Sequence, residues 1–339
     1  MRRSLARFVI GVVTAIVGGV ACTDSASDTV AAEAGSPDVL PLDVPDVGSS
    51  KDIADAPTPD SAAPDSPAPP DTTTVGESSI HRILWVGNSF TFFNDLDQIW
   101  LSVRKAQGLE ESIVSLRATA AGYRWVQHLA DATTDGGSEP IREWLVTAPP
   151  QWDFVVLQEQ SQIPGFPAGN PEHDASVEAA VALAGYAAAS GATPVLFETW
   201  AYRAGDSQNA DLFADYPTMQ DRLDEGFDAI ASAIAASGKA PVRLRAGAGF
   251  RVVYDAAVAA AQDPLAPGAL FSRLYTEDGR HPSVLGSYLT ACVLAATLAP
   301  DGTVGMDWAP PDVSETDASA LRDAAEGAVA LITSSRSPQ

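Results

Sequence analysis

The sequence predicts an α/β fold, a three-layer α/β/α sandwich around a central, mainly parallel sheet of five strands. Short apolar runs alternate with longer segments of helical periodicity over residues 80–335. This alternation is typical of a parallel sheet that is covered by helices on both faces. The run Phe-Val-Val-Leu at 154–157 is almost continuously apolar, as expected for a strand that is buried on both faces.

The individual elements follow from the spacing of the apolar residues. Strands are expected at residues 82–86, 112–116, 154–158, 194–198 and 242–245. Helices are expected at residues 95–106, 177–190, 220–237 and 284–298. Gly191 and Gly238 follow two of these helices as expected C-caps. Because ligands of open α/β sheets bind beyond the carboxyl ends of the strands, functional residues are expected just after strands.

The first 22 residues predict export. Three arginines precede an apolar run at 8–20, which is shorter than the roughly 20 residues of a membrane-spanning helix and suits a signal peptide. Gly19-Val20-Ala21-Cys22 resembles the lipobox of bacterial lipoproteins, with glycine where leucine is usual. The resemblance implies that Cys22 is acylated and that the protein is exported and lipid-anchored in a bacterial cell envelope. An ordinary secretory signal that is cleaved nearby is the alternative.

Residues 23–79 are expected to form a disordered tether. This stretch contains twelve acidic residues and one basic residue, Lys51, so it carries −11 of the net charge of −24. It has nine prolines and no aromatic residue, and such a composition buries too little apolar surface to offset the chain entropy. The folded domain is therefore expected at 80–335. The strongly negative charge argues against binding to nucleic acid or to an anionic membrane surface.

A candidate nucleophile follows the first expected strand, in the motif Gly87-Asn88-Ser89-Phe90-Thr91. A serine between a strand and a helix exposes its hydroxyl at the rim of the sheet. The N-terminus of the helix supplies N–H groups that stabilise negative charge. The same residue types also serve as ordinary turns and N-caps, so this motif alone leaves both interpretations open.

A candidate base precedes the last expected helix, in the motif Asp278-Gly279-Arg280-His281-Pro282. If Pro282 lies in the first helical turn, His281 lies at the positive end of a helix dipole and stays available as a base. Asp278 is expected to reach the other ring nitrogen and to fix the tautomer. Taken alone, the same spacing also fits a surface salt bridge.

Together, these two motifs resemble those of the SGNH (GDSL-like) hydrolase family, in the family's order and over the whole domain. The resemblance implies a flavodoxin-like SGNH hydrolase fold and a serine hydrolase with Ser89 as nucleophile, His281 as general base and Asp278 as its partner. The family's Gly-Asp-Ser-Leu signature stands here as Gly-Asn-Ser-Phe. The family's second block matches Gly122, whose backbone N–H would complete an oxyanion hole with that of Ser89.

The third block departs from the family's pattern. SGNH enzymes place Gly-x-Asn-Asp after the third parallel strand, and the asparagine donates to the oxyanion. Here residues 157–161 read Leu-Gln-Glu-Gln-Ser, and a glutamine amide can donate in the same way. Strand alternation places Gln158 and Gln160 on the same face, and we favour Gln160 because it lies further past the strand end. Alternatively, these glutamines only support the loops.

Asn88, Trp200 and Tyr202 are candidate substrate contacts. Trp200 and Tyr202 lie at the start of one of two long, aromatic-rich loops, at 162–174 and 201–216. Aromatic side chains there could stack on a sugar or line an acyl pocket, although anchoring of the loops is the alternative. The other aromatic residues of these loops are Phe166, Phe213 and Tyr216.

The cysteines and histidines predict neither a disulfide nor a metal site. If Cys22 is acylated, Cys292 has no partner in the chain, and its apolar surroundings predict an inert core thiol. The four histidines are scattered without the spacing of metal ligands. His128 is expected to be a structural histidine on a helix at 123–130. We therefore expect no metal and no cofactor.

These features predict a cell-surface ester hydrolase that works through an acyl-enzyme on a small-molecule or polysaccharide ester. Removal of O-acetyl groups from carbohydrate is the narrower hypothesis. A non-catalytic surface-binding lipoprotein on the same fold is one alternative, favoured by the altered third block. An acyltransferase is another. Neither the substrate nor the oligomeric state follows from the sequence.

Overall fold

The computed structural model describes the predicted α/β domain, over residues 82–109, 113–134, 140–147, 149–299 and 301–334, with side chains as far as 330. The signal peptide expected at 1–22, with Cys22, and the tether expected at 23–79 lie outside the described residues. All described residues belong to one compact unit.

Five parallel strands form one sheet in the order β2-β1-β3-β4-β5. The strands are β1 (Arg82–Gly87), β2 (Val114–Thr119), β3 (Phe154–Gln158), β4 (Thr193–Glu198) and β5 (Val242–Arg245). This is the flavodoxin-like order, so the predicted fold class is confirmed. The chain leaves β1 for β2 on one side and returns to β3 on the other, which creates a switch point at the carboxyl ends of β1 and β3.

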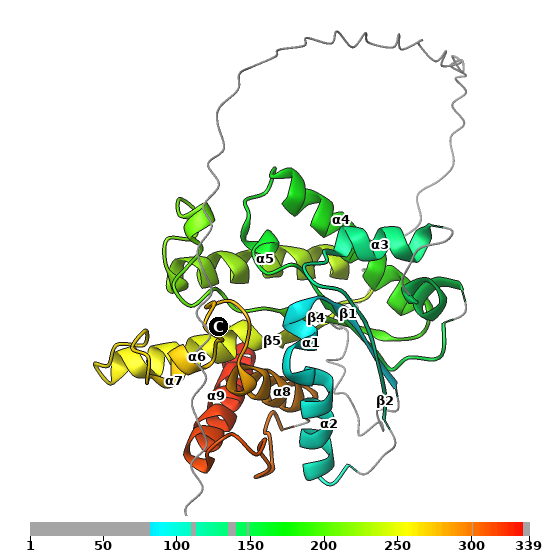
Figure 1. Cartoon of the computed structure of the whole chain (residues 1–339). Helices are drawn as coiled ribbons and strands as arrows, with labels where there is room; N and C mark the ends of the chain where they lie inside the picture. Colours follow the sequence, from blue (N-terminus) through cyan, green and yellow to red (C-terminus); the bar gives the residue numbers. More distant parts are fainter. Residues whose placement is uncertain (1–81, 110–112, 135–139, 148, 300, 335–339) are drawn as a thin grey trace, which may run out of the picture. The chain divides into compact units, whose positions relative to one another are not determined.

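Helices cover both faces of the sheet (Figure 1). α3, α4 and α5 pack on one face, where they contact β1, β3 and β4. α2, α8 and α9 form the opposite layer together with α6, and α8 packs against both α2 and α9. The helices are α1 (Ser89–Phe92), α2 (Leu96–Ala106), α3 (Trp125–Thr133), α4 (Pro171–Ala189), α5 (Tyr216–Ala236), α6 (Ala246–Ala259), α7 (Leu270–Arg273), α8 (Val284–Leu298) and α9 (Glu315–Ser334).

The centre of the domain consists of apolar strands and one fully enclosed helix. All residues of β3 are buried, and in β1 only Arg82 is exposed. α8 is apolar around its whole circumference because it lies between the sheet and three other helices, α2, α6 and α9. Cys292 lies on this helix without any exposed surface, and burial raises the pKa of its thiol to about 12. The prediction of a core thiol is confirmed.

Several predicted boundaries differ from the structure, and three of these differences have a clear local reason. β2 runs to Thr119 instead of ending at residue 116, because Arg117 interrupts its apolar pattern to pair with Asp95 and Asp97. α4 begins at Pro171 and α5 at Tyr216, earlier than predicted. Both start with an Asx cap followed by a proline in the first turn, and their first turns have little apolar periodicity.

The sequence does not predict α6, which carries Gly247 and Gly249 in its first turn and a half. A Cβ atom at residue 247 would lie 2.5 Å from the carbonyl oxygen of Thr199. Close packing therefore requires glycine at a helical position that glycine ordinarily disfavours.

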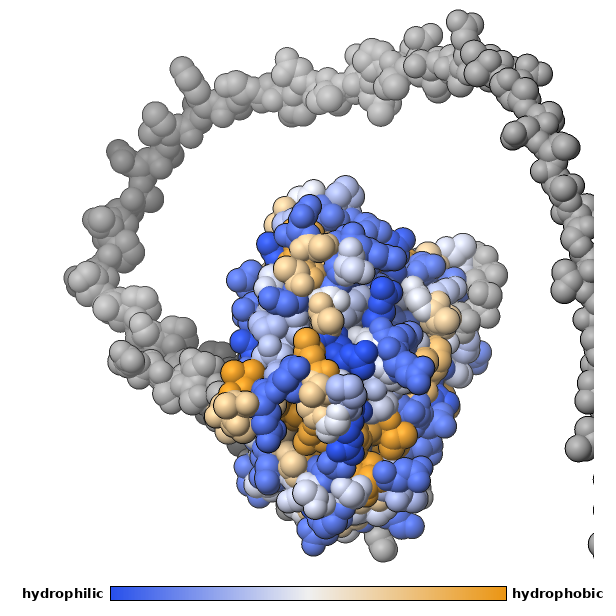
Figure 2. Space-filling model, turned by 60° about the vertical axis from the view of Figure 1, so that its left-hand side comes forward, coloured by the Kyte–Doolittle hydropathy of each residue, from blue (hydrophilic) through white to orange (hydrophobic). Residues whose placement is uncertain are grey.

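Polar side chains dominate the visible surface. On the face in Figure 2, apolar side chains lie in small patches between polar ones. Among the described helices, none combines the length and apolar character needed to cross a membrane.

Candidate active site

Ser89 lies where β1 ends and α1 begins. Asn88 is the N-cap of α1, and its Oδ1 accepts a hydrogen bond from the N–H of Phe90 at 3.1 Å. Ser89 is therefore the first residue of the helix, and its own N–H belongs to the group of N-terminal donors that have no partner within a helix. We call residues 87–91 the serine loop.

Buried side chains from other elements hold the serine loop. Oε1 of Gln158, at the end of β3, accepts from Asn88 N at 2.8 Å and from Thr91 Oγ1 at 2.9 Å. On the other side, Nδ2 of Asn88 donates to the carbonyl of Tyr123 at 2.8 Å. Gly87 must lack a side chain, because a Cβ atom there would lie 2.6 Å from Gln158 Oε1.

His128 also supports this loop, as the sequence predicts for a structural histidine. Its Nε2 lies 2.8 Å from the carbonyl oxygen of Gly87. Burial lowers the pKa of His128, although this hydrogen bond acts in the opposite direction. The neutral ring with Nε2 protonated donates to Gly87.

His281 lies in the connection between α7 and α8, and we call residues 276–283 the histidine loop. Within it, Oδ1 of Asp278 accepts from Thr276 Oγ1 at 2.7 Å, from Arg280 N at 2.8 Å and from His281 N at 3.0 Å. Gly279 completes the turn with a φ of +69°, a conformation that glycine adopts without strain. The turn therefore fixes the carboxylate of Asp278 in front of the ring of His281.

The two loops meet at one rim of the sheet. His281 Nε2 lies 2.8 Å from Ser89 Oγ, and His281 Nδ1 lies 2.5 Å from Asp278 Oδ2. The ring of Phe93 stacks on the imidazole with a centroid distance of 4.3 Å. Partial burial raises the pKa of Asp278, but its hydrogen bonds from His281, Arg280 and Thr276 outweigh this effect and hold it well below its usual range.

The helix dipole does not act on His281 in the predicted way. α8 begins at Val284 with Ser283 as its N-cap, so Pro282 precedes the cap and His281 lies outside the first helical turn. The carboxylate of Asp278, and not the end of α8, orients the ring of His281.

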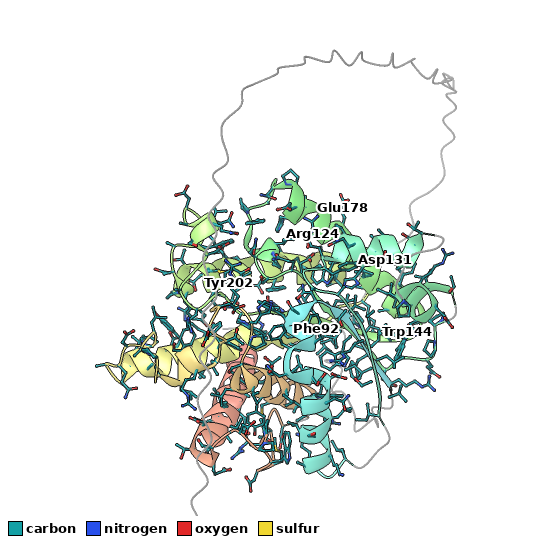
Figure 3. All side chains as sticks on the ribbon, viewed as in Figure 1. Phe92, Arg124, Asp131, Trp144, Glu178 and Tyr202 are labelled. Carbon is teal, nitrogen blue, oxygen red and sulfur yellow. The ribbon has the colours of Figure 1, made fainter. Side chains whose placement is uncertain are left out.

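A cavity of about 370 Å³ opens at the Ser89–His281 pair. Gly122, with a φ of +68°, and Gln160 both line it. Figure 3 labels two further lining residues, Phe92 on α1 and Tyr202 on the loop after β4. Gly122 and Gln160 thus line the same cavity as Ser89.

Gln158 is wrong as a candidate oxyanion donor. Its side chain is completely buried and does not line the cavity. Its Oε1 serves the serine loop, and its Nε2 donates to the backbone carbonyl of Glu159. Of the two glutamines considered, only Gln160 reaches the cavity.

Trp200 is wrong as a candidate substrate contact. Its indole has no exposed surface and lies between Phe90 and Phe250, with centroid distances of 4.9 and 4.5 Å. Its Nε1 donates to the carbonyl of Arg280 at 3.0 Å. Trp200 therefore contacts both Phe90, which follows Ser89, and Arg280, which precedes His281.

The other candidate contacts divide between cavity and core. Tyr202 and Asn88 line the cavity, although both are almost fully buried and Asn88 uses its amide to cap α1. Phe166, Phe213 and Tyr216 are buried, and Phe166 stacks on Phe213. For Phe166, Phe213 and Tyr216, the structure therefore supports the alternative, in which aromatic side chains anchor the loops.

Glu159 is a buried carboxylate that the sequence does not single out. Its Oε1 accepts from Trp125 N at 3.0 Å and from Gln160 N at 2.7 Å, and its Oε2 accepts from Ser176 Oγ at 2.5 Å. Burial raises the pKa of Glu159 to about 7, against the lowering effect of these hydrogen bonds. Glu159 thereby connects the start of α3, just after Gly122, to the backbone of Gln160.

The described part of the chain contains no cluster of three or more His, Cys, Asp or Glu side chains that could hold a metal ion. The rim brings a hydroxyl, an imidazole and a carboxylate together at one cavity.

Comparisons with solved structures place the chain in a family. A protein from Slackia heliotrinireducens that is assigned to the SGNH hydrolases is 31% identical, over 65% of this chain and 100% of that protein, with a TM-score of 0.48. A DUF4886 family protein from Bacteroides uniformis is 18% identical, over 74% of this chain and 95% of that protein, with a TM-score of 0.55. The acetylxylan esterase Axe2 from Geobacillus stearothermophilus is 14% identical, over 69% of this chain and 100% of Axe2, with a TM-score of 0.44.

No protein-family model matches the chain, and none of the curated proteins matches it significantly. The likeness to the Bacteroides protein shows a shared fold. The sequence identity to the Slackia protein extends over that protein's whole length. On this identity, the chain belongs to the SGNH hydrolase family.

Proposed function

We propose that the protein hydrolyses carboxylic esters, with Ser89 as nucleophile and His281 as general base. The observation that carries this proposal is the continuous chain of hydrogen bonds from Ser89 Oγ through His281 to Asp278 at the edge of the cavity. With Nδ1–H donating to Asp278, Nε2 is free to accept the proton of the Ser89 hydroxyl.

The reaction then has two halves. Ser89 Oγ attacks the ester carbonyl while its proton moves to His281 Nε2, and the protonated ring next gives that proton to the leaving alcohol. Water attacks the resulting acyl-enzyme with His281 again as base, which releases the acid and restores Ser89. The ionised Asp278 stabilises the imidazolium in both halves.

We assign the oxyanion to three donors: the N–H groups of Ser89 and Gly122 and the amide of Gln160. The exposure of Gln160 and Gly122 to the cavity supports this assignment. Preorganised donors of this kind stabilise the charge that develops in the transition state, and each typically contributes about 3 kcal/mol.

Labelling with a fluorophosphonate probe, together with turnover of p-nitrophenyl acetate, tests the proposal. Wild-type protein should be labelled, and Ser89→Ala should lose labelling and at least about 10³-fold in kcat. Ser102→Ala is a matched control, since this serine lies on α2 and only donates to the carbonyl of Gln98. A folded wild-type protein that is neither labelled nor active would leave the non-catalytic binding protein as the better hypothesis.

The narrower substrate hypothesis is O-acetylated carbohydrate. A cavity of about 370 Å³ is near the lower end for small-molecule sites, which favours a short acyl group. A panel of acetylated sugars and longer-chain esters tests this hypothesis. Faster turnover of long-chain esters would contradict it, and transfer of the acyl group to an added sugar would indicate an acyltransferase.

We further propose that acylated Cys22 anchors the enzyme to a membrane of a bacterial cell envelope. The basic residues, the apolar run and the small residues before Cys22 support this proposal. Cys22→Ser should move the protein from the membrane fraction to the soluble fraction. Cys292→Ala is the matched control, since it changes the other cysteine of the chain. Unchanged partitioning of Cys22→Ser would contradict the anchor.

A further inference from the structure

One arginine in the wall of the Ser89–His281 cavity has no carboxylate partner among the described residues. Arg280, the residue before His281, lines the cavity and is partly buried. Elsewhere in the described part of the chain, arginines such as Arg117, Arg124 and Arg243 pair with Asp or Glu. No carboxylate of the described residues forms an ion pair with the guanidinium of Arg280, although its neighbour Asp278 is bonded to His281.

Arg280 is held over an aromatic ring. Its Cζ lies 4.8 Å from the centroid of the Tyr202 ring, within the range of a cation–π contact. Tyr202 is itself fixed, because its hydroxyl donates to Gln162 Oε1 at 2.6 Å and pairs with Ser161 Oγ at 2.7 Å. Tyr202 therefore provides a rigid platform from the loop after β4 (Figure 3).

The N–H donors of the Arg280 guanidinium have no hydrogen-bond partner in the described part of the chain. A contact with the face of an aromatic ring involves the π-system of the guanidinium, while its N–H groups lie in the guanidinium plane. No hydrogen bond from the Arg280 side chain to another described residue is present in the structure, whereas its backbone carbonyl accepts from Trp200. A planar, preorganised fork of N–H donors matches a carboxylate.

We propose that Arg280, supported by Tyr202, binds a carboxylate of the substrate, so that the enzyme prefers esters that carry a negative charge close to the scissile bond. Because it concerns the substrate of the same cavity, this preference rests on the proposed function. Arg280 adjoins His281 in the chain, and both line the same cavity as Ser89. The carboxylate must therefore lie within one small substrate unit of the ester carbonyl.

The acidic character of the whole chain does not oppose this contact. The net charge is −24, but interactions between exposed charges are largely screened beyond about 8 Å at physiological ionic strength. A carboxylate in direct contact with Arg280 experiences mainly that neighbour. Arg280 would therefore contribute specificity and not long-range attraction.

Two matched pairs of esters test the preference and locate the carboxylate. In the first pair, mono-O-acetyl glucuronate is compared with mono-O-acetyl glucose, and the negative charge lies in the alcohol part of the ester. 4-Nitrophenyl hemisuccinate against 4-nitrophenyl butyrate places the charge in the acyl part, with a four-carbon acyl group in both. In at least one pair, the wild-type kcat/KM should be about 10- to 100-fold higher for the charged member, the range of a hydrogen bond to a charged group.

Variants of Arg280 assign the preference to this side chain. Arg280→Gln should lower the charged-to-neutral ratio to about 1, and Arg280→Lys should give an intermediate ratio, since it keeps the charge and loses the planar fork. Arg203→Gln is the matched control. It removes a positive charge from the same loop as Tyr202, at a residue that lines a different cavity, and should retain the wild-type ratio.

The outcomes separate this preference from the proposed function. If the neutral and charged esters are cleaved with equal kcat/KM in both pairs, or if Arg280→Gln keeps the wild-type ratio, the carboxylate subsite is wrong while the hydrolase stands. If Arg203→Gln also lowers the charged-to-neutral ratio of kcat/KM to about 1, the preference arises from the overall electrostatic potential near the cavity. The proposed direct contact between Arg280 and the carboxylate is then wrong. Absence of all turnover, together with absence of fluorophosphonate labelling of Ser89, would overturn both.

Discussion

The serine loop and the histidine loop line the same cavity, but different contacts hold them in place. The serine loop depends on side chains and backbone groups from distant parts of the chain. Its partners Gln158, Tyr123 and His128 lie 70, 35 and 41 positions away from the residues they bind. These contacts are buried or partly buried and come from β3 and from α3 with the segment before it.

In the histidine loop, local hydrogen bonds fix the Asp278–His281 pair, while Asn94, Trp200 and Arg203 bind carbonyls of the loop from outside. Asp278 accepts all of its hydrogen bonds from residues no more than three positions away. Its side chain is 45% exposed, and that of His281 is 27% exposed. The placement of Asp278 against His281 is therefore encoded locally, whereas the conformation of the serine loop requires the folded core.

This difference predicts different consequences for substitutions. A conservative change in the histidine loop should alter the rate and leave stability nearly unchanged. A change beneath the serine loop should alter both, because the same hydrogen bonds hold the core and Ser89.

The largest effect on rate is expected for Asp278→Asn. The asparagine keeps Oδ1 for the three donors within the turn, but its Nδ2 replaces the acceptor that orients His281 Nδ1. The wrong tautomer is then favoured, and kcat should fall by about 10³- to 10⁴-fold. Urea unfolding at neutral pH should show a change of at most about 1 kcal/mol, as for other surface positions.

Asp301→Asn is the matched control, because Asp301 accepts from Thr303 in a similar exposed turn away from the cavity. The pKa of Asp278 is lowered in the folded protein, so its contribution to stability is present above its ordinary pKa of 3.8 and is lost as the pH falls below it. A loss of less than tenfold in kcat would contradict the orienting role of Asp278.

The second-largest effect on rate is expected for Gln158→Leu, which should lower both kcat and stability. Leucine has a similar size but leaves Asn88 N and Thr91 Oγ1 without their buried acceptor. Each orphaned donor costs about 1–3 kcal/mol, and a displacement of the nucleophile by about 1 Å costs up to roughly 10²-fold in kcat. Urea unfolding and p-nitrophenyl acetate turnover measure the two effects.

A double-mutant cycle with Thr91→Val sharpens this prediction. Valine removes the hydroxyl that Gln158→Leu would orphan, so the double variant should lose less stability than the sum of the single variants. If the losses simply add, Gln158 and Thr91 do not form the buried pair that supports the serine loop.

The same contrast explains which parts of the site can be predicted from sequence. Asp278 and His281 are separated by three positions in a turn, so the spacing alone places the carboxylate at the ring. Strand alternation places Gln158 and Gln160 on one face but does not say which reaches the cavity. That choice depends on the close approach of Gly87 and on Thr91, which lies 67 positions from Gln158.

The fold divides in a similar way. The apolar runs predict all five strands, and β3 and β5 have the predicted bounds. Trp200 illustrates the limit of such patterns. Its position after β4 correctly places it near the rim, but its burial between Phe90 and Phe250 depends on side chains more than 40 positions away in each direction.

Trp200→Phe should have a smaller effect than Gln158→Leu. Phenylalanine keeps an aromatic ring between Phe90 and Phe250 but leaves the carbonyl of Arg280 without its donor. We expect kcat to fall about tenfold, with little change in KM. This loss corresponds to an activation free energy that is higher by about 1.4 kcal/mol, because the two loops are less well aligned.

Trp152→Phe is the control for Trp200→Phe. Its indole is also buried and also donates to a carbonyl, that of Trp144 at 2.8 Å, on the segment before β3. Both variants should lose stability, but only Trp200→Phe should lose rate. Equal values of kcat for the two variants would show that Trp200 supports the fold and does not align the loops.

The smallest effect on rate is expected for Glu159→Gln, and its signature is the dependence of stability on pH. The glutamine oxygen can keep the N–H groups of Trp125 and Gln160, and its NH₂ group can donate to Ser176, so kcat should change by less than about threefold at pH 6.

The pKa of Glu159 is raised from 4.5 to about 7 in the folded protein, so the unfolded chain releases this proton at lower pH. The associated stability is fully present below pH 4.5 and is lost as the pH rises through 7. Between these values, the free energy of unfolding should fall with pH more steeply for the wild type than for Glu159→Gln. Glu178→Gln, an exposed change on the same helix as Ser176, should follow the wild type. Parallel profiles for wild type and Glu159→Gln would mean that Glu159 stays ionised as an acceptor of its three hydrogen bonds, and that these bonds outweigh the cost of burying its charge.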